Sequence, residues 1–240
     1  MRNILLALTL LATNVGAGPA AAQVNNDFAW SGAVGYGKTV EIRGVNGSVR
    51  ALTSDDGAVH VEVAKEARRS DPAGVRIEVV EHEEGVTICA VYPTPERSRV
   101  QNTCRRGGGP MSVRNNDVEV DFVVRIPAGV RLAAKTVNGA IDVQALRSDV
   151  EATTVNGGVT IETTGFVSRA TTVNGEVVLE VPADLNAELH ATTVNGRIDS
   201  DFPISVTGRM SRRSLRGTIG GGGPELRATT VNGSIRLRRR

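Results

Sequence analysis

Two cysteines and three histidines are the side chains of this chain best able to do chemistry. Cys89 and Cys104 lie 15 residues apart, and in an exported protein an even pair is most simply a disulfide. Such a disulfide would stabilise the fold by about 3 kcal/mol in the chain-entropy account. A metal site or a thiol nucleophile would need histidine and acidic companions at ligand spacing, and none stands nearby.

The histidines, His60, His82 and His190, lie far apart in the sequence. His82 belongs to the acidic run 81–84, which could bind a metal weakly, but a solvated turn is the favoured interpretation of such a run. His190 falls on a predicted outward position. Four carboxylates could pair on one face, although their spacing alone does not show it: Glu180, Asp184, Asp199 and Asp201.

Known catalytic and phosphate-binding motifs are missing from the sequence. The glycines at 220–223 are not followed by Lys-Ser or Lys-Thr, so we interpret them as a flexible or tightly bent connection. There is no serine-hydrolase motif, zinc-protease motif or calcium-binding nonapeptide repeat. We therefore expect no catalytic residues, no metal site and no cofactor, and a protein that is not an enzyme.

Residues 1–22 predict a secretory signal peptide. Arg2 is their only charge, residues 4–12 form the apolar stretch, and alanines at 20–22 offer a cleavage site before Gln23. Nine apolar residues cannot cross a hydrocarbon core of about 30 Å, and no later stretch is long enough. We therefore expect an exported chain that does not span the membrane and that resides in the periplasm, at the cell surface or outside the cell.

The charge balance argues against nucleic acid as a partner. Removing Arg2 from the 28 basic residues leaves a net charge of +1 against the 26 acidic ones, whereas nucleic-acid-binding proteins usually carry a concentrated positive face. Four arginines at the C-terminus are the exception, and we interpret them as a charged final strand or solvated tail rather than an anion site: Arg236, Arg238, Arg239 and Arg240.

Residues 23–125 predict a less regular β region with almost no helix signal. β-branched residues alternate with polar ones in four segments, as in half-buried strands: 29–50, 59–63, 75–80 and 86–91. The breaks between them have turn composition. A long polar loop at 93–116 follows, and the disulfide would staple it to the strand that holds Cys89.

The repeat in residues 126–240 indicates the architecture, which we expect to continue from the preceding region. Thr-Val-Asn-Gly occurs five times, and a looser Gly-Val-Asn-Gly lies at 44–47. Successive copies are 18, 18, 21 and 37 residues apart, and residues 214–217 could be a worn copy within the last step. So short a period is typical of stacked repeats. The expected repeat turns are Asn46, Gly47, Asn138, Gly139, Asn156, Gly157, Asn174, Gly175, Asn195, Gly196, Asn232 and Gly233.

Alternation around each Asn assigns the side chains to two faces. Alanine always stands four residues before Asn and threonine two before it, whereas the residue five before it is mostly charged. Because side chains alternate across a strand, the first series should face inward. The position six before Asn belongs to the same inward series: Leu132, Val150, Ser168, Leu189 and Leu226.

The apolar alternation slips by one residue at Asn-Gly. We interpret this slip as the corner of a coil, with glycine at positive φ. The alternative is a two-residue hairpin in a meander that closes into a sandwich or barrel. Coils stacked at about 4.8 Å would align the Thr and Asn columns into ladders, in which buried Asn amides bond one another.

One column of the repeat does not fit this scheme. Its valines fall on the outward parity, so they either form an exposed apolar stripe that could bind a partner or turn into the core at the corner. We favour the core. The column consists of Val137, Val155, Val173, Val194 and Val231.

Three segments together resemble the bacterial putative-adhesin family of exported β-strand-repeat proteins. They are the Cys-bearing strand at 88–93, the segment 118–130 (which contains Arg-Ile-Pro-Ala-Gly-Val) and the serial Thr-Val-Asn-Gly copies. The likeness covers residues 27–238. It implies an all-β fold, a single-chain and right-handed β-solenoid of the parallel β-helix type, and it carries over no functional residues.

The functional hypothesis is a non-catalytic exported module that acts as an adhesin or as a binding or structural component of the envelope. Its partner would be a surface glycan, another envelope protein or a second copy of the chain. One alternative is a carbohydrate-active enzyme, with acids near the interruptions at 93–116 and 203–224. Another is a stress-response scaffold that assembles end to end, although an Arg-rich edge strand would discourage such pairing.

Overall fold

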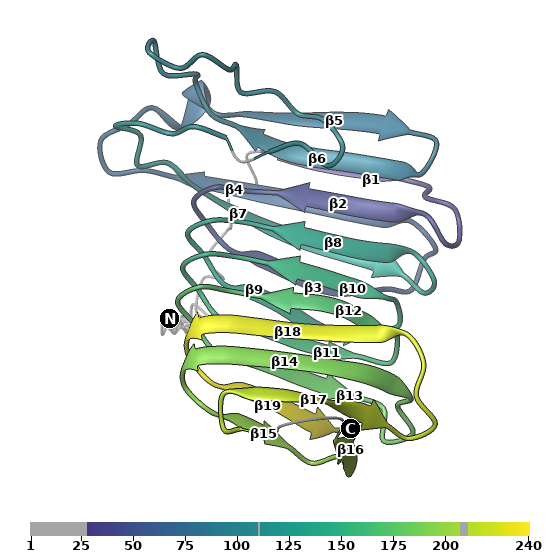
Figure 1. Ribbon diagram of the computed structural model, residues 1–240. Helices are drawn as coiled ribbons and strands as arrows, with labels where there is room; N and C mark the ends of the chain where they lie inside the picture. The colour runs from purple at the N-terminus through teal and green to yellow at the C-terminus, as the bar shows by residue number, and fades with distance from the viewer. Residues whose placement is uncertain (1–27, 110, 207–210) are drawn as a thin grey trace, which may run out of the picture.

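Two β-sheets face each other in the computed structural model, which describes residues 28–109, 111–206 and 211–240 (Figure 1). The predicted signal peptide at 1–22 lies outside these residues. The first sheet, sheet A, has the strand order β1 (Phe28–Gly32), β4 (Val59–Glu66), β7 (Glu119–Pro127), β3 (Val49–Ser54), β9 (Ile141–Leu146), β11 (Val159–Thr163), β13 (Val177–Val181), β19 (Ile235–Arg239) and β15 (Ile198–Ser200).

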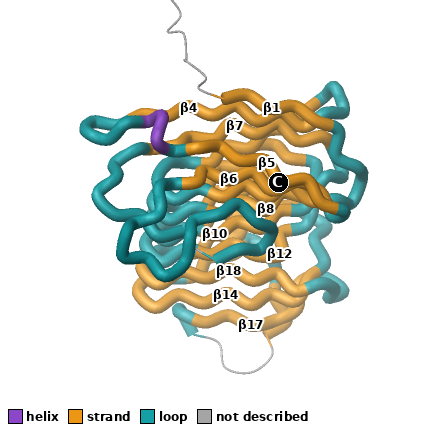
Figure 2. The backbone as a smooth tube through the Cα atoms, turned by 90° about the horizontal axis from the view of Figure 1, so that it is seen from above, coloured by secondary structure: helices purple, strands orange, loops and turns teal. Residues whose placement is uncertain are grey.

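The second sheet, sheet B, runs alongside the first. Its order is β16 (Ile204–Val206), β17 (Ser214–Ile219), β14 (Ala187–Asn195), β18 (Glu225–Asn232), β12 (Val167–Thr171), β10 (Val150–Thr153), β8 (Arg131–Lys135), β2 (Thr39–Arg43), β6 (Gly85–Val91) and β5 (Arg76–His82). Within the described residues, the one helical turn is the 3₁₀ segment η1 (Pro72–Gly74). Viewed from above, η1 lies among the loops at one end of the strands (Figure 2). The all-β prediction is confirmed.

Strand direction divides the molecule into a regular middle and two different ends. In sheet B, neighbouring strands are parallel from β6 through β2, β8, β10, β12 and β18 to β14. In sheet A, they are parallel from β7 through β3, β9, β11, β13 and β19 to β15. Antiparallel strands β1, β4 and β5 flank the middle at one end, and β16 and β17 flank it at the other. The sheets are therefore mixed and open.

Every copy of the repeat links a strand of sheet B to the next strand in sheet A. The copy at 136–139, for example, leads from β8 to β9, and the one at 154–157 leads from β10 to β11. The corner interpretation of Asn-Gly is thus confirmed, and the hairpin alternative is wrong for these copies. Residues 214–217 are not a worn copy, because they form part of β17, which runs antiparallel to β14.

The order of the strands departs from the order of the sequence at the C-terminus. β18 lies between β12 and β14, and β19 lies between β13 and β15. Figure 1 shows the yellow β18 between the green strands β12 and β14. The expectation that successive copies lie directly over one another therefore holds for 138, 156 and 174 but is wrong for 195, which pairs with 232 instead.

The space between the sheets is filled by small aliphatic side chains, as the low aromatic content requires. The predicted alanine column is buried in all five copies: Ala134, Ala152, Ala170, Ala191 and Ala228. One inward prediction is wrong. Ser168 is exposed, and Val167 takes its place in the core, because the register between β10 and β12 shifts by one residue at Val150.

Candidate functional site

The repeat turns form a single ridge along the edge where the chain passes from sheet B to sheet A. Along the ridge, the asparagine side chains hydrogen-bond in the order 46, 138, 156, 174, 232 and 195. Each Nδ2 donates to the Oδ1 of the preceding asparagine at 2.7–2.9 Å. At the N-terminal end, Asn46 donates to the carbonyl of Val118 at 3.4 Å. The predicted asparagine ladder is confirmed, but it is not buried, since the asparagines from 138 onward are exposed.

The threonines of the repeat are the buried polar groups. None of the five is more than 5 % exposed: Thr136, Thr154, Thr172, Thr193 and Thr230. Their hydroxyls do not bond one another. Each donates to the glycine carbonyl of the neighbouring turn, as Thr154 does to Gly139 at 2.8 Å, which satisfies a buried donor. The predicted threonine ladder therefore runs between side chain and backbone.

Close packing of successive turns explains why glycine ends each copy. A Cβ at Gly157 would overlap the carbonyl of Gly139, and one at Gly175 would overlap that of Gly157. The predicted positive φ is clear at Gly47, where φ is 110°, but Gly139 and Gly175 do not adopt it. The shared requirement is the absence of a side chain rather than a left-handed backbone.

The valine column is only partly buried, so the favoured prediction of a buried column holds in part: three of the five valines are half-buried, and Val137 packs against the core. Val155 is 36 % exposed and Val194 is 50 % exposed, while Val45 in the looser copy is buried. The strands that precede the first three copies end two residues before valine, so these valines lie in the turn itself. The ridge thus presents alternating amides and half-exposed methyl groups.

The predicted disulfide between Cys89 and Cys104 is confirmed, with a Cα–Cα distance of 5.6 Å. It ties residues 93–116, which we call the strap, to the outer face of sheet B. No strand or helix forms among the described residues of the strap. Arg43 on β2 also holds it, by donating to the carbonyl of Arg105 at 2.8 Å and to those of Gly108 and Gly109 at 2.5 Å.

A carboxylate lies buried beneath the strap. Glu41 on β2 accepts from Lys135 at 2.9 Å, from the Gly107 N–H at 3.0 Å and from the Thr87 hydroxyl at 3.1 Å. Burial raises the pKa of Glu41, but Lys135 and the two hydrogen bonds outweigh burial and hold it below its ordinary value. These contacts fix the strap and leave Glu41 no free role in chemistry.

His82 belongs to the same polar network, so the prediction of a solvated turn is wrong for its side chain. It is half-buried, its Nε2 lies 3.2 Å from the Thr87 hydroxyl, and its Nδ1 is buried without a partner in the described residues. His190 lies at the surface, as expected, 3.1 Å from Glu225. No group of three metal-ligating side chains occurs within the described part of the chain.

The third histidine lies in a hydrogen-bonded row that the sequence did not suggest. Ser31 Oγ lies 2.8 Å from His60 Nδ1, and His60 Nε2 lies 2.6 Å from Asp56 Oδ2. β1 and β4 bring the first two together, since Ser31 and His60 are register partners. Hydrogen bonds from Ser54, Ala58 and His60 lower the pKa of Asp56 to about 2. The row lies on the outer face of sheet A.

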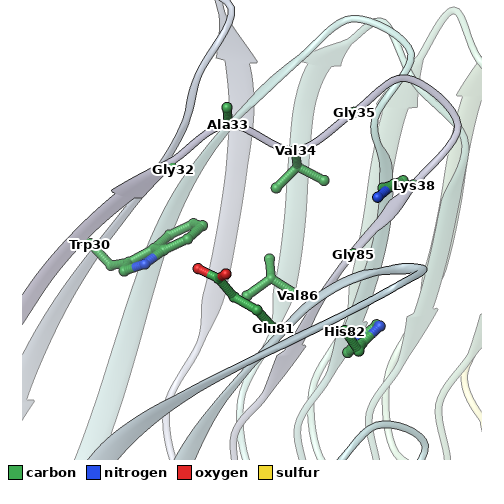
Figure 3. A pocket seen from close by; sticks show the side chains of 10 residues that line it. All are labelled: Trp30, Gly32, Ala33, Val34, Gly35, Lys38, Glu81, His82, Gly85 and Val86. Carbon is green, nitrogen blue, oxygen red and sulfur yellow. The ribbon is translucent and has the colours of Figure 1, made fainter.

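A small hollow of about 160 Å³ opens at the N-terminal end, between the edge strands of the two sheets (Figure 3). Trp30 of β1 forms one wall, Lys38 stands on the opposite side, and Val34 and Val86 supply apolar surface between them. The side chain of Glu81, from β5, extends toward the indole. No hydrogen bond or ion pair of the Glu81 carboxylate is found among the described residues.

Trp30 can take this position because a glycine follows two residues later. A Cβ at Gly32 would overlap the six-membered ring of the indole. No motif in the sequence marks the hollow. The signal that could have found it is the single tryptophan of the chain, which lies in the middle of the first strand.

Two solved structures of bacterial proteins match this chain over most of its length. A protein described as a putative cell adhesion protein from Clostridium sporogenes ATCC 15579 superposes with a TM-score of 0.53 at 9 % identity, and the match covers 89 % of this chain and 99 % of that one. A protein described as a putative adhesin from Bacteroides fragilis NCTC 9343 is matched over 89 % of this chain and 96 % of its own, with 11 % identity and a TM-score of 0.33. The first match shows a shared fold.

Comparisons by sequence gave no match. No known protein-family profile fits the chain, and no curated protein is similar to it. Among the described residues, no helix is both long enough and apolar enough to cross a membrane.

Proposed function

We propose that this chain is an exported β-solenoid that serves as a non-catalytic adhesin or binding module of the bacterial envelope. The observation that carries the proposal is the parallel stack with all its Asn-Gly turns on one ridge, since stacked repeats generally present extended surfaces for binding. The disulfide fits an oxidising compartment outside the cytosol. The adhesion-related description of the fold neighbour supports the same class. The right-handed winding stays a prediction.

The partner we propose is a surface glycan. A second copy of the chain is less well supported, but one argument against it fails. The Arg-rich last strand was expected to protect an edge, yet β19 lies inside sheet A, between β13 and β15. Its arginines pair with neighbouring carboxylates, as Arg236 does with Glu176 and Arg238 with Asp201, both at 2.8 Å. They form the charged final strand rather than an anion site.

The test is to immobilise the chain without residues 1–22 and to probe it with a glycan array and with polysaccharides extracted from the native envelope. The proposal expects saturable binding to a subset of glycans and no release of new reducing ends from the bound polysaccharide. Release of reducing ends would support the carbohydrate-active alternative. Light scattering at increasing protein concentration would reveal self-association instead.

One observation favours a second candidate, an esterase-like acyl transfer at Ser31. The row from Ser31 through His60 to Asp56 contains a hydroxyl, a base and an orienting carboxylate at hydrogen-bond distances. We rank it second because Asp56 is 59 % exposed in its side chain and Ser31 does not line the hollow beside Trp30. A fluorophosphonate probe would label Ser31 if it is activated. Labelling that disappears in Ser31→Ala and in His60→Gln would make the chain an enzyme.

A further inference from the structure

The hollow beside Trp30 combines three kinds of group that recognise one class of ligand. An indole offers an apolar face, the Glu81 carboxylate accepts hydrogen bonds, and the Lys38 ammonium donates them. Val34 and Val86 complete the walls. The exposed lining is more polar than apolar, which suits a ligand rich in hydroxyl groups better than an apolar one.

The charges on the two walls select among possible ligands. A quaternary or primary amine would fit between an aromatic ring and a carboxylate, but Lys38 places a second cation on the opposite wall. The carboxylate of an acidic sugar would be repelled by the Glu81 carboxylate. Together, Glu81 and Lys38 contribute no net charge, which favours a neutral ligand that both donates and accepts.

We propose that this hollow is the site at which the chain binds a neutral pyranose, as the terminal residue of a glycan. One apolar face of the sugar ring stacks on Trp30, and adjacent hydroxyls donate to Glu81 and accept from Lys38. The inference rests on the proposed function and names the ligand class and the place of binding. It places recognition of the terminal sugar at one end of the molecule, in addition to the extended surface of the ridge.

The environment of Glu81 supports a role in binding rather than in folding. Two neighbouring acids of the β5–β6 region have ion-pair partners, since Glu78 pairs with Arg76 at 3.0 Å and Glu84 pairs with Arg106, whereas Glu81 and Glu83 have none among the described residues. Glu81 faces the same side of its strand as Val79, above the end of the core, and its register partner Val86 is buried. A carboxylate placed over apolar surface without a structural contact is available to a ligand.

The single tryptophan supplies the measurement. Since Trp30 is the only tryptophan of the chain, its fluorescence reports on the hollow alone. Titration of the chain with methyl glycosides of neutral hexoses and with N-acetylglucosamine should give a saturable change in emission for at least one of them. A dissociation constant of about 1 mM is expected for so small a ligand. Glucuronic acid and choline should give no saturable change.

Variants separate the site from the fold and from the general proposal. Glu81→Gln should weaken the sugar titration about tenfold or more, because it removes a charged acceptor. Glu83→Gln, in the same turn but outside the lining, is the matched control and should bind normally. Gly32→Ala keeps every polar group but displaces the indole, and it should also weaken binding. Circular dichroism identifies any variant that fails to fold.

The outcomes distinguish this inference from the proposed function. If the native chain binds glycans on an array and Glu81→Gln binds equally well, the hollow is not the site, although the protein remains a glycan-binding module. Saturable binding of choline, or of glucuronic acid in preference to neutral sugars, also overturns the inference. If the native chain binds no glycan at all, both fail together.

Discussion

The repeat stack and the N-terminal end of this molecule are built from the same kind of strand but are held together differently. Each turn of the stack contacts only its two neighbours, through one asparagine amide, one threonine hydroxyl and one glycine without a side chain. The N-terminal end relies on antiparallel strands, a disulfide, a buried carboxylate and a strap. The hollow and the Ser31–His60–Asp56 row both lie in this second region.

This difference indicates where chemistry can arise in a repeat protein. Successive repeat units pack directly on one another, so their side chains are used in core packing and in the hydrogen-bond ladders. Where the repeat is interrupted, side chains such as Trp30 and Glu81 have no equivalent above or below them. The site that we propose therefore consists of residues that the repeat does not explain.

The largest expected effect is a break in the stack. Gly157→Ala introduces a Cβ against the backbone carbonyl of Gly139, which cannot move without shifting its own turn. We expect a loss of about 3 kcal/mol in the free energy of unfolding, measured by urea denaturation. Gly109→Ala is the matched control, because a Cβ there meets nothing within 4 Å. Equal stability of the two variants would contradict the close-packed ridge.

Loss of the disulfide tests the other region. Cys89→Ser combined with Cys104→Ser should lower the free energy of unfolding by about 3 kcal/mol. Limited proteolysis should then cut within residues 93–116, while the TVNG strands stay protected. Native chain under reducing conditions should behave in the same way. If cleavage began in the stack instead, the two regions would not be independent in stability.

Acid should weaken the attachment of the strap. The pKa of Glu41 is lower in the folded state than its ordinary value of 4.5, so its stabilising contacts are fully present above that pH. They are lost as the pH falls through the lowered folded pKa. At pH 7, Glu41→Gln should therefore be less stable than the native chain by about 2 kcal/mol, and this gap should narrow as the pH falls below 4.5. A gap that is constant between pH 7 and pH 3 would exclude the ionised carboxylate as its cause.

The smallest effect is expected on the asparagine ladder, where position should matter. Asn156→Ala removes two amide hydrogen bonds, whereas Asn195→Ala, at the end of the ladder, removes one. Because these amides are exposed, we expect about 1 kcal/mol for the first and about half of that for the second, measured by thermal or urea unfolding. An equal loss at both positions would show that the ladder is not additive.

Local alternation made much of the stack predictable. The alanine and threonine columns face inward, the corners lie at Asn-Gly, and the disulfide joins the two cysteines, as the sequence indicates. Neighbour order was not predictable at the C-terminus. Val177, Ile198 and Ile235 are chemically similar, so a rung carrying any of them can stack on the next. The repeated alternation therefore predicts the strands and corners but does not determine the order of the strands in each sheet.

The candidate site could not be predicted for a different reason. The lining residues come from three separate segments: Trp30 from β1, Lys38 from the connection before β2, and Glu81 from β5. No regular spacing in the sequence relates them. The valine column shows the same limit at short range. The alternation placed the valines on the outward side of the strand. Whether the turn rotates Val155 inward depends on the backbone conformation of the corner, which the sequence does not give.

The position of β18 and β19 has a consequence for how the chain is made. Both strands are flanked by pairs that a ribosome produces earlier, β12 and β13 on one side and β14 and β15 on the other. The permanent neighbours of those four strands therefore do not exist until residues 225–239 have been synthesised. Without β18 and β19, β12 would lack its partner toward β14 and β13 its partner toward β15, so residues 225–239 join the two parts of each sheet.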